Sequence, residues 1–459
     1  MSDLQPRTTV DRAKLAAVAA EESAMFTERH PRSRERFERA RGSLLGGVPM
    51  TWMAKWAGGH PVYAAGARGA SITDVDGHRY VDFALGDTGA MAGHSPAPTV
   101  EAVQRRLAQD GGATLMLPTE DAAWVGEELG RRFGVPLWSF ALTATDANRW
   151  LLRLCRAVTG RPHVLVFNFC YHGSVDEVFV TLDGGGPRSR DGNVGPAVDP
   201  TTTTRVVEFN ELAALEAALA DEQVACVLME PALTNIGIVL PEPGYLEAVR
   251  AACDRTGTLL INDETHTFSA GPGGCTKAWD LRPDAVTMGK SIAGGIPIGA
   301  YGVSAELARR VGALADADLV DTGGVGGTLA GNALSLAAAR ATLSEVLTDE
   351  AFDGMIALCE RFVTGVREVV ESTGLPWSIV PLGARAELAF AAEPPRTGGD
   401  SAALHDTALE DALHLFMLNR GVLITPFHNM ALMCPATTEA DVDRHTEVFG
   451  AFASAVAAG

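Results

Sequence analysis

Residues 259–264 read LLINDE, and residues 288–302 read MGKSIAGGIPIGAYG. In both places polar residues directly follow a short apolar run, which is typical of a strand buried on both faces of a parallel sheet. The carboxyl ends of parallel strands lie at one edge of the sheet, and ligand sites collect at that edge. We therefore expect Asp263 and Lys290 to lie near each other there.

The surrounding sequence alternates strands and helices from about residue 95. Apolar strands are predicted at 163–167, 224–229, 257–262 and 285–288, and helices at 98–107, 122–133 and 147–158. The strand at 224–229 also ends on a polar residue, Glu230. This alternation predicts an α/β fold with a mostly parallel sheet covered by helices on both faces. We assign residues 95–340 to this large domain.

The two flanking segments predict a smaller domain. Residues 1–94 contain a helical arm over 16–25, which ends at His30-Pro31, and a hairpin over 71–83 with an Asp-Gly turn. Residues 341–459 predict an α+β domain with strands at 385–390 and 421–425 and a closing helix at 439–457. We expect 1–94 to form part of the same small domain as 341–459.

Composition excludes several classes of function. The chain carries 57 acidic and 37 basic side chains, for a net charge of −20, and without a Lys/Arg run we expect no nucleic-acid partner. Its seven cysteines are scattered and none forms a CxxC pair, so we expect neither a disulfide framework nor a zinc site. For the same reason we expect the protein to act in the reducing cytoplasm. The sequence shows neither an apolar run of about 18 residues nor a signal peptide, so we expect no membrane span.

Two nucleotide-binding motifs come close to the quoted stretches without matching them. Residues 289–291 (GKS) resemble the end of a P-loop, but the first glycine of that motif would fall on Asp284. A P-loop also normally precedes the acidic strand that 259–264 resembles, whereas here the order is reversed. Residues 324–326 (GVG) begin a dinucleotide fingerprint, but Leu329 stands in place of its third glycine. Both interpretations fail.

The lysine and the acid together meet the needs of pyridoxal phosphate (PLP). This cofactor requires a lysine for a Schiff base and a carboxylate that keeps its pyridine nitrogen protonated, so that the ring withdraws electrons. Asp263 ends an apolar strand, where a buried carboxylate is costly unless it faces a cation. Lys290 is flanked by glycine and apolar residues, which let a ring approach the backbone.

At this point the sequence resembles the class III, fold type I aminotransferases, and within them the glutamate-1-semialdehyde 2,1-aminomutase-like group. The resemblance runs from about residue 36 to the C-terminus and includes further motifs in order. These are DVDG at 74–77, GH at 93–94, CYHG at 170–173, EP at 230–231, Asn235 with Gly237, and GTLAGN at 327–332. The resemblance implies the PLP-dependent transferase fold type I, as in aspartate aminotransferase, and a homodimer whose two subunits both build each site.

The resemblance also implies roles for single residues. Lys290 matches the Schiff-base lysine, and Asp263 matches the acid that pairs with the pyridine nitrogen. Tyr171 matches the aromatic residue that stacks on the cofactor ring, with His172 behind it. Asn235 lies where family members contact the ring hydroxyl. Lys290, Asp263 and Tyr171 form the predicted catalytic set.

The phosphate loop departs from the family. Family members carry Ser-Gly-Thr-Glu-Ala at a helix start, whereas residues 143–147 here are Thr-Ala-Thr-Asp-Ala. Backbone N–H groups at a helix N-terminus still bind phosphate, so Ala144 and Thr145 remain predicted cofactor contacts. Thr328 matches the residue that reaches the phosphate of the neighbouring subunit. Glu230 is a further predicted contact, with a bond to a backbone group as the equal alternative.

Substrate recognition is less specified. An amino acid substrate needs a carboxylate anchor, usually an arginine. Arg385, on a predicted strand, and Arg396 are the candidates, although Arg385 can also pair with Glu387 on the same strand face. Trp52 is a candidate wall of the substrate pocket.

We expect a PLP-dependent aminotransferase that moves an amino group from an amine or amino acid, including a β-amino acid, to a 2-oxo acid or aldehyde. An intramolecular 2,1-aminomutase or an amino acid racemase or epimerase would use the same residues. A non-catalytic PLP-binding protein is a further alternative. His266 follows Asp263 closely, but no third ligand has suitable spacing, so we expect no metal.

Overall fold

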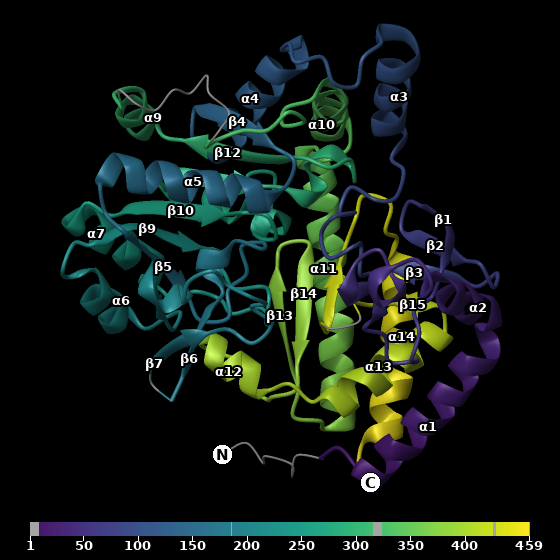
Figure 1. The fold of residues 1–459 in the computed structure, drawn as a ribbon. Coiled ribbons are helices and arrows are strands. Elements are labelled where there is room, and N and C mark those ends of the chain that lie inside the picture. Colours follow the sequence, from purple (N-terminus) through teal and green to yellow (C-terminus); the bar gives the residue numbers. More distant parts are fainter. Residues whose placement is uncertain (1–8, 185, 315–323, 426–427, 459) are drawn as a thin grey trace. The chain divides into compact units, whose positions relative to one another are not determined.

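The structure is a computed structural model that describes residues 9–184, 186–314, 324–425 and 428–458. The chain folds into two compact units, each assembled from segments distant in sequence (Figure 1). The sheet unit comprises Pro96–Phe352 and Pro395–Ala403. The terminal unit comprises Met1–Ser95, Asp353–Pro394 and Leu404–Gly459. The three-segment division expected from the sequence stays a prediction.

A seven-stranded sheet forms the centre of the sheet unit, with the strand order β4-β12-β11-β10-β9-β5-β8. The pairs among β8, β5, β9, β10 and β11 are parallel, and β12 runs antiparallel to both β11 and β4. The strands are β4 (Leu137–Ala141), β5 (His163–Phe167), β8 (Thr204–Val207), β9 (Val224–Met229), β10 (Leu259–Asp263), β11 (Ala285–Met288) and β12 (Gly299–Val303). The predicted α/β fold with a mostly parallel sheet is confirmed.

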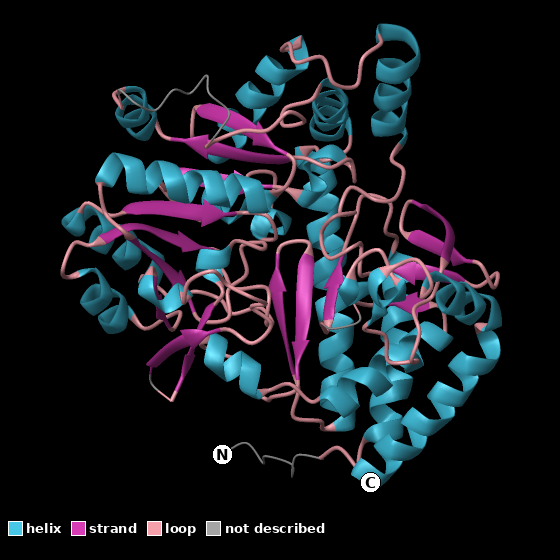
Figure 2. Cartoon of the chain, in the orientation of Figure 1, coloured by secondary structure: helices cyan, strands magenta, loops and turns pink. Residues whose placement is uncertain are grey.

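Helices surround this sheet (Figures 1 and 2). Helix α5 packs on β9, β11 and β12, while α4 packs on β4, α6 on β8 and α7 on β10. The longer helices of the unit are α3 (Ala97–Arg105), α4 (Glu120–Phe133), α5 (Ala144–Thr159), α6 (Leu212–Leu219), α7 (Tyr245–Thr256), α9 (Ala305–Gly312) and α10 (Ala333–Glu345). Shorter elements are η3 (Arg106–Asp110), η6 (Thr267–Ala270), α8 (Gly274–Ala278), η7 (Lys290–Ala293), α12 (Gly398–Ala403) and the hairpin β6 (Val180–Asp183) with β7 (Gly186–Ser189).

Burial explains why the inner strands read as continuous apolar runs. Every residue of β9 and of β10 is buried, because helices cover the sheet. A strand buried on both faces has no polar face to alternate with, so its sequence shows an unbroken apolar run. Asp263 is the last residue of β10 and is buried as well. The polar group at this strand end therefore requires partners inside the protein.

The terminal unit contains two smaller sheets, β1-β2-β3-β15 and β13-β14-β16. The predicted hairpin is present, with Ile72 opposite Tyr80 in β2 and β3. Its strands are β1 (Ala64–Arg68), β2 (Ser71–Asp74), β3 (Arg79–Asp82), β13 (Ser378–Leu382), β14 (Arg385–Ala389), β15 (Val422–Leu423) and β16 (Met430–Leu432). Its helices are α1 (Arg12–Arg29), α2 (Pro31–Ala40), α13 (Thr407–Asn419) and α14 (Glu439–Val456), and α11 (Asp349–Thr373) begins in the sheet unit. Among all described helices, none has the length and apolar character to cross a membrane.

A buried hydrogen-bond network joins the α1–α2 junction to the hairpin. The Tyr80 hydroxyl donates to Oδ2 of Asp74 over 2.6 Å and also lies 2.8 Å from Nε2 of His30. Nδ1 of His78 lies 3.0 Å from the same carboxylate. Burial alone would raise the pKa of Asp74, but the hydrogen bonds from Tyr80 and His78 more than offset it and lower that pKa. The network fixes the Asp-Gly hairpin in place.

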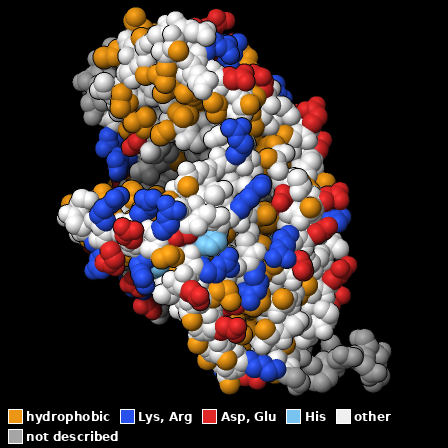
Figure 3. Space-filling model, turned by 90° about the vertical axis from the view of Figure 1, so that its right-hand side faces the viewer, with side chains coloured by type: hydrophobic (Ala, Val, Ile, Leu, Met, Phe, Trp, Pro, Cys, Tyr) orange, Lys and Arg blue, Asp and Glu red, His pale blue; other side chains and the backbone are white. Residues whose placement is uncertain are grey.

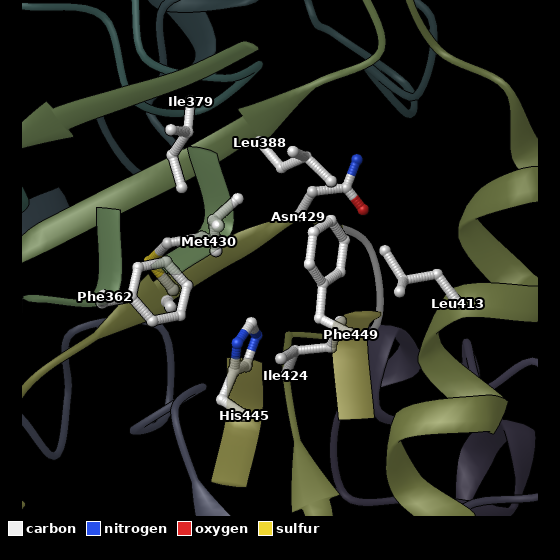
Figure 4. Close-up of a pocket in the computed structure, with 11 residues that line it drawn as sticks. Phe362, Ile379, Leu388, Leu413, Ile424, Asn429, Met430, His445 and Phe449 are labelled. Carbon is white, nitrogen blue, oxygen red and sulfur yellow. The ribbon is translucent and has the colours of Figure 1, made fainter. Parts of the chain in front are cut away.

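The terminal unit also encloses a small cavity lined mainly by apolar side chains from its helices and strands (Figure 4). The volume that the centre of a water molecule can occupy in this cavity is about 20 Å³. This is enough space for one water molecule and too little for a cofactor. His445 points into it and packs against the rings of Phe83, Phe362 and Phe449. Burial lowers the pKa of His445 to about 3, so this histidine is neutral at physiological pH. The cavity belongs to the core and carries no chemistry.

Candidate active site

Two neighbouring strands bring the acid and the lysine to one sheet edge. Asp263 ends β10 and lies in register with Thr287 of β11, and Gly289 and Lys290 follow that strand. Lys290 has a φ of 52°, a left-handed conformation that costs a residue with a side chain about 1–2 kcal/mol. Strain of this kind persists only where the surrounding structure enforces it. The turn after β11 therefore fixes the position of this lysine.

Asp263 is held by three hydrogen bonds. Its Oδ2 accepts from Nδ2 of Asn148 over 2.8 Å and lies 2.9 Å from Nδ1 of His172, while its Oδ1 accepts from the Thr265 N–H over 3.1 Å. The side chain is 3% exposed. Burial alone would raise the pKa of Asp263, but the bonds and the charge of His172, together with Thr265 and Asn148, lower it to about 2. The group is a carboxylate throughout the physiological range.

His172 supplies the positive partner of that carboxylate. Burial on its own would lower the pKa of His172, but Cys170 and the Asp263 carboxylate raise it well above its ordinary value. His172 is buried, so its positive charge depends on these neighbours, and Nδ1 lies 2.9 Å from Oδ2 of Asp263. The pair keeps Asp263 anionic and oriented, as a partner for a protonated ring nitrogen must be.

The N-terminus of α5 lies tightly against the same edge. A Cβ added at Gly289 would lie 2.9 Å from Cβ of Ala144, and one at Gly299 would collide with the carbonyl group of Thr143. At Gly173, whose φ is 79°, an added Cβ would collide with Thr145. Three glycines, in two loops and at the start of β12, thus let the backbone approach the first turn of α5, where N–H groups without helical partners can bind an anion.

This packing predicts a specific sensitivity at Gly289. Its φ of −165° is open to any residue, so Gly289→Ala tests space alone. The added methyl must push the first turn of α5 or the Lys290 turn aside, because the neighbouring atoms are backbone and a short side chain. We expect the dissociation constant for PLP, measured by titration of the apoenzyme, to rise at least about tenfold. Gly312→Ala, at a helix end with open space around it, is the matched control, and equal affinity in the two variants would contradict the account.

Tyr171, Asn235 and Glu230 come from the two loops beside this edge. The Tyr171 ring is 37% exposed and meets Phe179 edge-on at 6.4 Å. Nδ2 of Asn235 donates to the Phe169 carbonyl over 3.3 Å. Glu230 is buried and accepts from the N–H groups of Tyr171 and Thr234 over 3.2 and 3.0 Å. Burial raises its pKa, and its carboxylate holds the Tyr171 loop in place.

Lys290 differs from the other lysines of the chain. The sequence has four, and Lys14, Lys55 and Lys277 are exposed, whereas Lys290 is half-buried. Its Nζ lies 2.7 Å from Nε2 of His266. A partly buried amine in contact with a histidine suits a lysine that reacts with a bound aldehyde better than a lysine that is only solvated at the surface.

The residues at this edge fit PLP. A cofactor of this kind needs a lysine amine, a permanently anionic carboxylate and a site for a phosphate dianion. Lys290, Asp263 and the first turn of α5 supply these in turn, and the three glycines leave the space that a Cβ would fill. The Thr143 hydroxyl caps α5 by accepting from the Asp146 N–H over 3.2 Å. The loop without the family's glycine therefore still begins a regular helix at Ala144.

The remaining predicted residues come from other segments of the chain. Thr328 is exposed on a turn of the sheet unit before α10. Trp52 is 41% exposed and belongs, like Arg385, to the terminal unit. Arg396 lies on the surface of the sheet unit and binds Glu211 over 2.5 Å as well as Glu242. These two ion pairs occupy the Arg396 guanidinium, so Arg385 is the better candidate for a substrate anchor.

Arg385 is fully buried in β14. Its Nη1 donates to the Thr88 hydroxyl over 3.4 Å, and its Nη2 lies 4.0 Å from Oε2 of Glu387. The other oxygen of Glu387 lies 3.2 Å from Nδ1 of His428. Both interpretations of the sequence therefore stay open, because the pairing with Glu387 exists but is long.

Arg385→Leu separates them. Removing one partner of a buried charge pair costs about 3–5 kcal/mol, so we expect a fall in the melting temperature measured by calorimetry. If the side chain also anchors a substrate carboxylate, KM rises steeply for an amino acid and not for an amine without a carboxylate. An unchanged melting temperature would contradict the structural pairing. Equal kinetic losses for both substrates would contradict the anchor.

Two functional residues were not predicted from the sequence. Asn148 lies in the second turn of α5, and its amide donates to both the His172 carbonyl and Asp263. His266 was considered only as a metal ligand, yet it lies against Lys290. The signal for Asn148 is a polar residue among buried helix positions, since it is fully buried itself. His266 has no comparable signal, because its contact depends on the Lys290 turn.

Comparisons with known proteins agree with this geometry. A family model described as "Aminotransferase class-III" matches residues 52–455. A glutamate-1-semialdehyde 2,1-aminomutase of Chloroflexus aggregans is 34% identical, over 93% of this chain and 99% of its own. The crystal structure of a glutamate-1-semialdehyde-aminomutase from Pseudomonas aeruginosa PAO1 is 47% identical, covers 97% of this chain and 99% of its own, and superimposes with a TM-score of 0.94. An omega-transaminase from Sphaerobacter thermophilus is 29% identical, with coverages of 92% and 97% and a TM-score of 0.83.

Proposed function

The chain belongs to the class-III aminotransferases and uses PLP, and on that basis we propose that it is a 2,1-aminomutase, which moves an amino group between adjacent carbons of one substrate. The sequence alone favoured a transaminase, with the aminomutase as the alternative. The relatives change that order, because the enzymes at 31–34% identity and the structural neighbour at 47% carry the aminomutase name. The observation that carries the proposal is the 47% identity to a structure named as an aminomutase over nearly the whole chain, against 29% to the omega-transaminase.

The substrate class that this implies is an amino aldehyde of the glutamate-1-semialdehyde type. PLP, when bound, supplies an aldehyde that holds the migrating nitrogen and a ring that withdraws electrons from the reacting carbon. Lys290 would hold the cofactor while it is in its aldehyde form and, once released, would move a proton to and from the reacting carbon with its Nζ. Its position after β11 keeps that nitrogen at the edge where Asp263 lies.

Asp263 and its partners keep the ring ready to withdraw electrons. A carboxylate with a pKa of about 2 stays charged, so it holds a proton on a facing ring nitrogen. His172 and Asn148 orient it from behind, and neither needs to move during the reaction. The first turn of α5 would bind the phosphate through its free N–H groups and so hold the cofactor near Lys290.

The need for an acceptor distinguishes the two amino-transfer reactions. We expect the enzyme, supplied in its amino-cofactor form, to isomerise an amino aldehyde repeatedly in the absence of any oxo acid. Adding pyruvate or 2-oxoglutarate should neither raise the rate nor produce alanine or glutamate. Turnover that stops after one equivalent and resumes only with an oxo acid would establish a transaminase instead. Racemisation without isomerisation would establish the third alternative.

We also place the active enzyme in a homodimer. Several large apolar side chains of the sheet unit are exposed between 41% and 82%, namely Leu107, Leu115, Met116, Leu117 and Leu329. Hydrophobic side chains gather at the top of the face in Figure 3, at the height where Figure 1 labels α3, α4 and α10. The Leu334 N–H, at the start of α10, donates to the Ala113 carbonyl, which ties the segment before Leu115 to the helix that follows Leu329. An exposed apolar area of this kind suits a second copy of the chain.

Thr328 tests the shared site. It is exposed beside Leu329, so in a dimer its hydroxyl can reach the phosphate bound by the partner. We expect Thr328→Ala to raise the dissociation constant for PLP about tenfold, since a hydrogen bond to a charged group is worth about 1.5–3 kcal/mol. Sedimentation should show an unchanged dimer. A monomeric wild type with full activity would contradict both the dimer and the contact.

The cysteines are consistent with a reducing cytoplasm as the place of action. All seven are free and buried in the structure. An oxidising compartment would favour disulfides, which stabilise secreted proteins. We therefore propose that the enzyme is cytoplasmic. We also propose that it acts on small molecules and has no nucleic-acid partner, because the chain has a net charge of −20.

A further inference from the structure

Lys290 makes a contact that the proposed chemistry does not yet use. Its Nζ lies 2.7 Å from Nε2 of His266, a distance typical of a strong hydrogen bond. His266 is 7% exposed and directly precedes η6. The histidine therefore meets the reactive nitrogen itself.

The backbone on the His266 side of this contact is fixed. The buried Glu264 carboxylate accepts from the N–H groups of Cys275 and Thr276 over 3.1 and 2.5 Å, and from the Thr276 hydroxyl over 2.6 Å. The Phe268 N–H donates to the Glu264 carbonyl over 2.9 Å, which closes the turn that contains His266. A residue held this firmly keeps its position through the reaction.

The backbone on the Lys290 side is equally constrained. Gly289 lies against Ala144 with no room for a side chain, and Lys290 itself has a φ of 52°. The two nitrogens therefore face each other because both turns are rigid. If two mobile side chains met only by chance, the backbone at Gly289 and Lys290 would not need to be constrained in this way.

A count of protons shows what the contact does. Two basic nitrogens at 2.7 Å must share one proton, because two facing lone pairs or two facing N–H groups repel each other. Lys290 as an ammonium donates to a neutral His266, and Lys290 as an amine accepts from a His266 that carries a hydrogen on Nε2. The nearby carboxylates are used otherwise, since Asp263 is bonded to His172 and Glu230 to the Tyr171 loop.

We propose that His266 is the proton partner of Lys290. When Lys290 takes a proton from the substrate carbon, the proton on Nζ passes to Nε2 of His266, which restores the amine and leaves an imidazolium. The reverse transfer returns the proton, and no other bond changes. This inference rests on the proposed role of Lys290. It makes His266 a catalytic residue, because its Nε2 touches a reacting atom.

The test compares His266→Gln with His266→Ala. Glutamine retains a hydrogen-bond acceptor for Lys290 but cannot carry a proton, whereas alanine leaves space for an added imidazole. The control is His405→Gln, which removes an exposed histidine that pairs with Glu410 in the terminal unit. Stopped-flow absorbance follows one half-reaction of the holoenzyme with an amino substrate deuterated at the carbon that bears nitrogen.

We expect His266→Gln to slow the half-reaction about 10²-fold, with a larger deuterium effect than the wild type. Imidazole should accelerate His266→Ala and leave His266→Gln unchanged. A separate measurement needs no turnover: PLP should attach to Lys290 of the full-length apoenzyme about tenfold more slowly in both variants, because the amine loses its proton acceptor. His405→Gln should match the wild type throughout.

Wild-type rates in His266→Gln would overturn the inference. So would equal losses in both variants without imidazole rescue, since that pattern indicates positioning alone. Failure of the aminomutase function shows separately, as turnover that stops after one equivalent without an oxo acid. Failure of the proposed role of Lys290 looks different, because PLP would then attach to the chain independently of Lys290. In that case Lys290→Ala would bind the cofactor covalently, whatever happens at His266.

Discussion

Lys290→Ala is expected to abolish covalent attachment of PLP and to lower turnover by about 10⁴-fold or more. The variant loses the amine that holds the cofactor and, in the same atom, the base that moves the proton. Its fold should persist, because Lys290 is half-buried and its contact with His266 is a single hydrogen bond. The substitution should not relieve the backbone strain at this position, because alanine has a similar conformational cost at a φ of 52°.

Three measurements check this result. Absorbance spectra should show PLP bound without the covalent link, and steady-state assays should show the loss of turnover. Calorimetry should give a melting temperature close to that of the wild-type apoenzyme. Lys277→Ala, which removes an exposed lysine, is the control and should leave all three unchanged. Residual covalent attachment in Lys290→Ala would contradict the assignment.

Asp263→Asn carries the second-largest expected effect, a loss of turnover of roughly 10²- to 10³-fold. An amide cannot hold a proton on the ring nitrogen, so the ring withdraws electrons less strongly. The change also removes the anionic partner of His172, whose pKa then falls because burial disfavours its charged form. We therefore expect stability to fall together with turnover, since breaking a buried pair costs about 3–5 kcal/mol.

Asp284→Asn separates these two consequences. Asp284 immediately precedes β11, at the opposite end of that strand from Lys290, and binds Arg250 over 2.9 Å. Its loss should lower the melting temperature without affecting the cofactor spectrum or turnover. PLP should remain bound to Asp263→Asn with an altered absorbance spectrum. Near wild-type turnover in Asp263→Asn would refute the role of the acid.

The stability of the wild type should depend on pH through the same residue. The folded-state pKa of Asp263 is about 2, below that of an unfolded aspartate, so its contribution is complete above the unfolded value and is lost as pH falls toward 2. This contribution disappears in Asp263→Asn.

The parts of the fold that the sequence predicted are those where local pattern and tertiary environment agree. The strands at 163–167, 224–229 and 285–288 match β5, β9 and β11 because both faces are covered and every residue is apolar or neutral. The turn after β10 was placed correctly for the same reason. The hairpin of β2 and β3 followed from its Asp-Gly turn, which is a local signal.

Strand β12 was missed, and its glycines explain why. Residues 299–303 contain two glycines, which normally weaken a strand. In the fold both are required, since a Cβ at Gly299 would collide with Thr143 and one at Gly302 with the Trp138 ring. Local propensity cannot reveal a requirement imposed by a helix and a strand distant in sequence.

The site divides in the same way. Lys290 and Asp263 were predictable because each follows a readable strand. Asn148 was not, because its role depends on the contact of α5 with the end of β10, which is distant in sequence. The contact of His266 with Lys290 depends on the left-handed backbone conformation of Lys290, which no sequence pattern predicts.

Reduction of the holoenzyme with borohydride, followed by peptide mapping, tests the central claim most directly. Borohydride fixes PLP to the lysine that holds it, and the chain offers only Lys14, Lys55, Lys277 and Lys290. We predict a pyridoxyl label on Lys290 alone, which the half-buried position of this lysine supports. A label on any of the other three, or no label at all on protein saturated with PLP, would contradict the account.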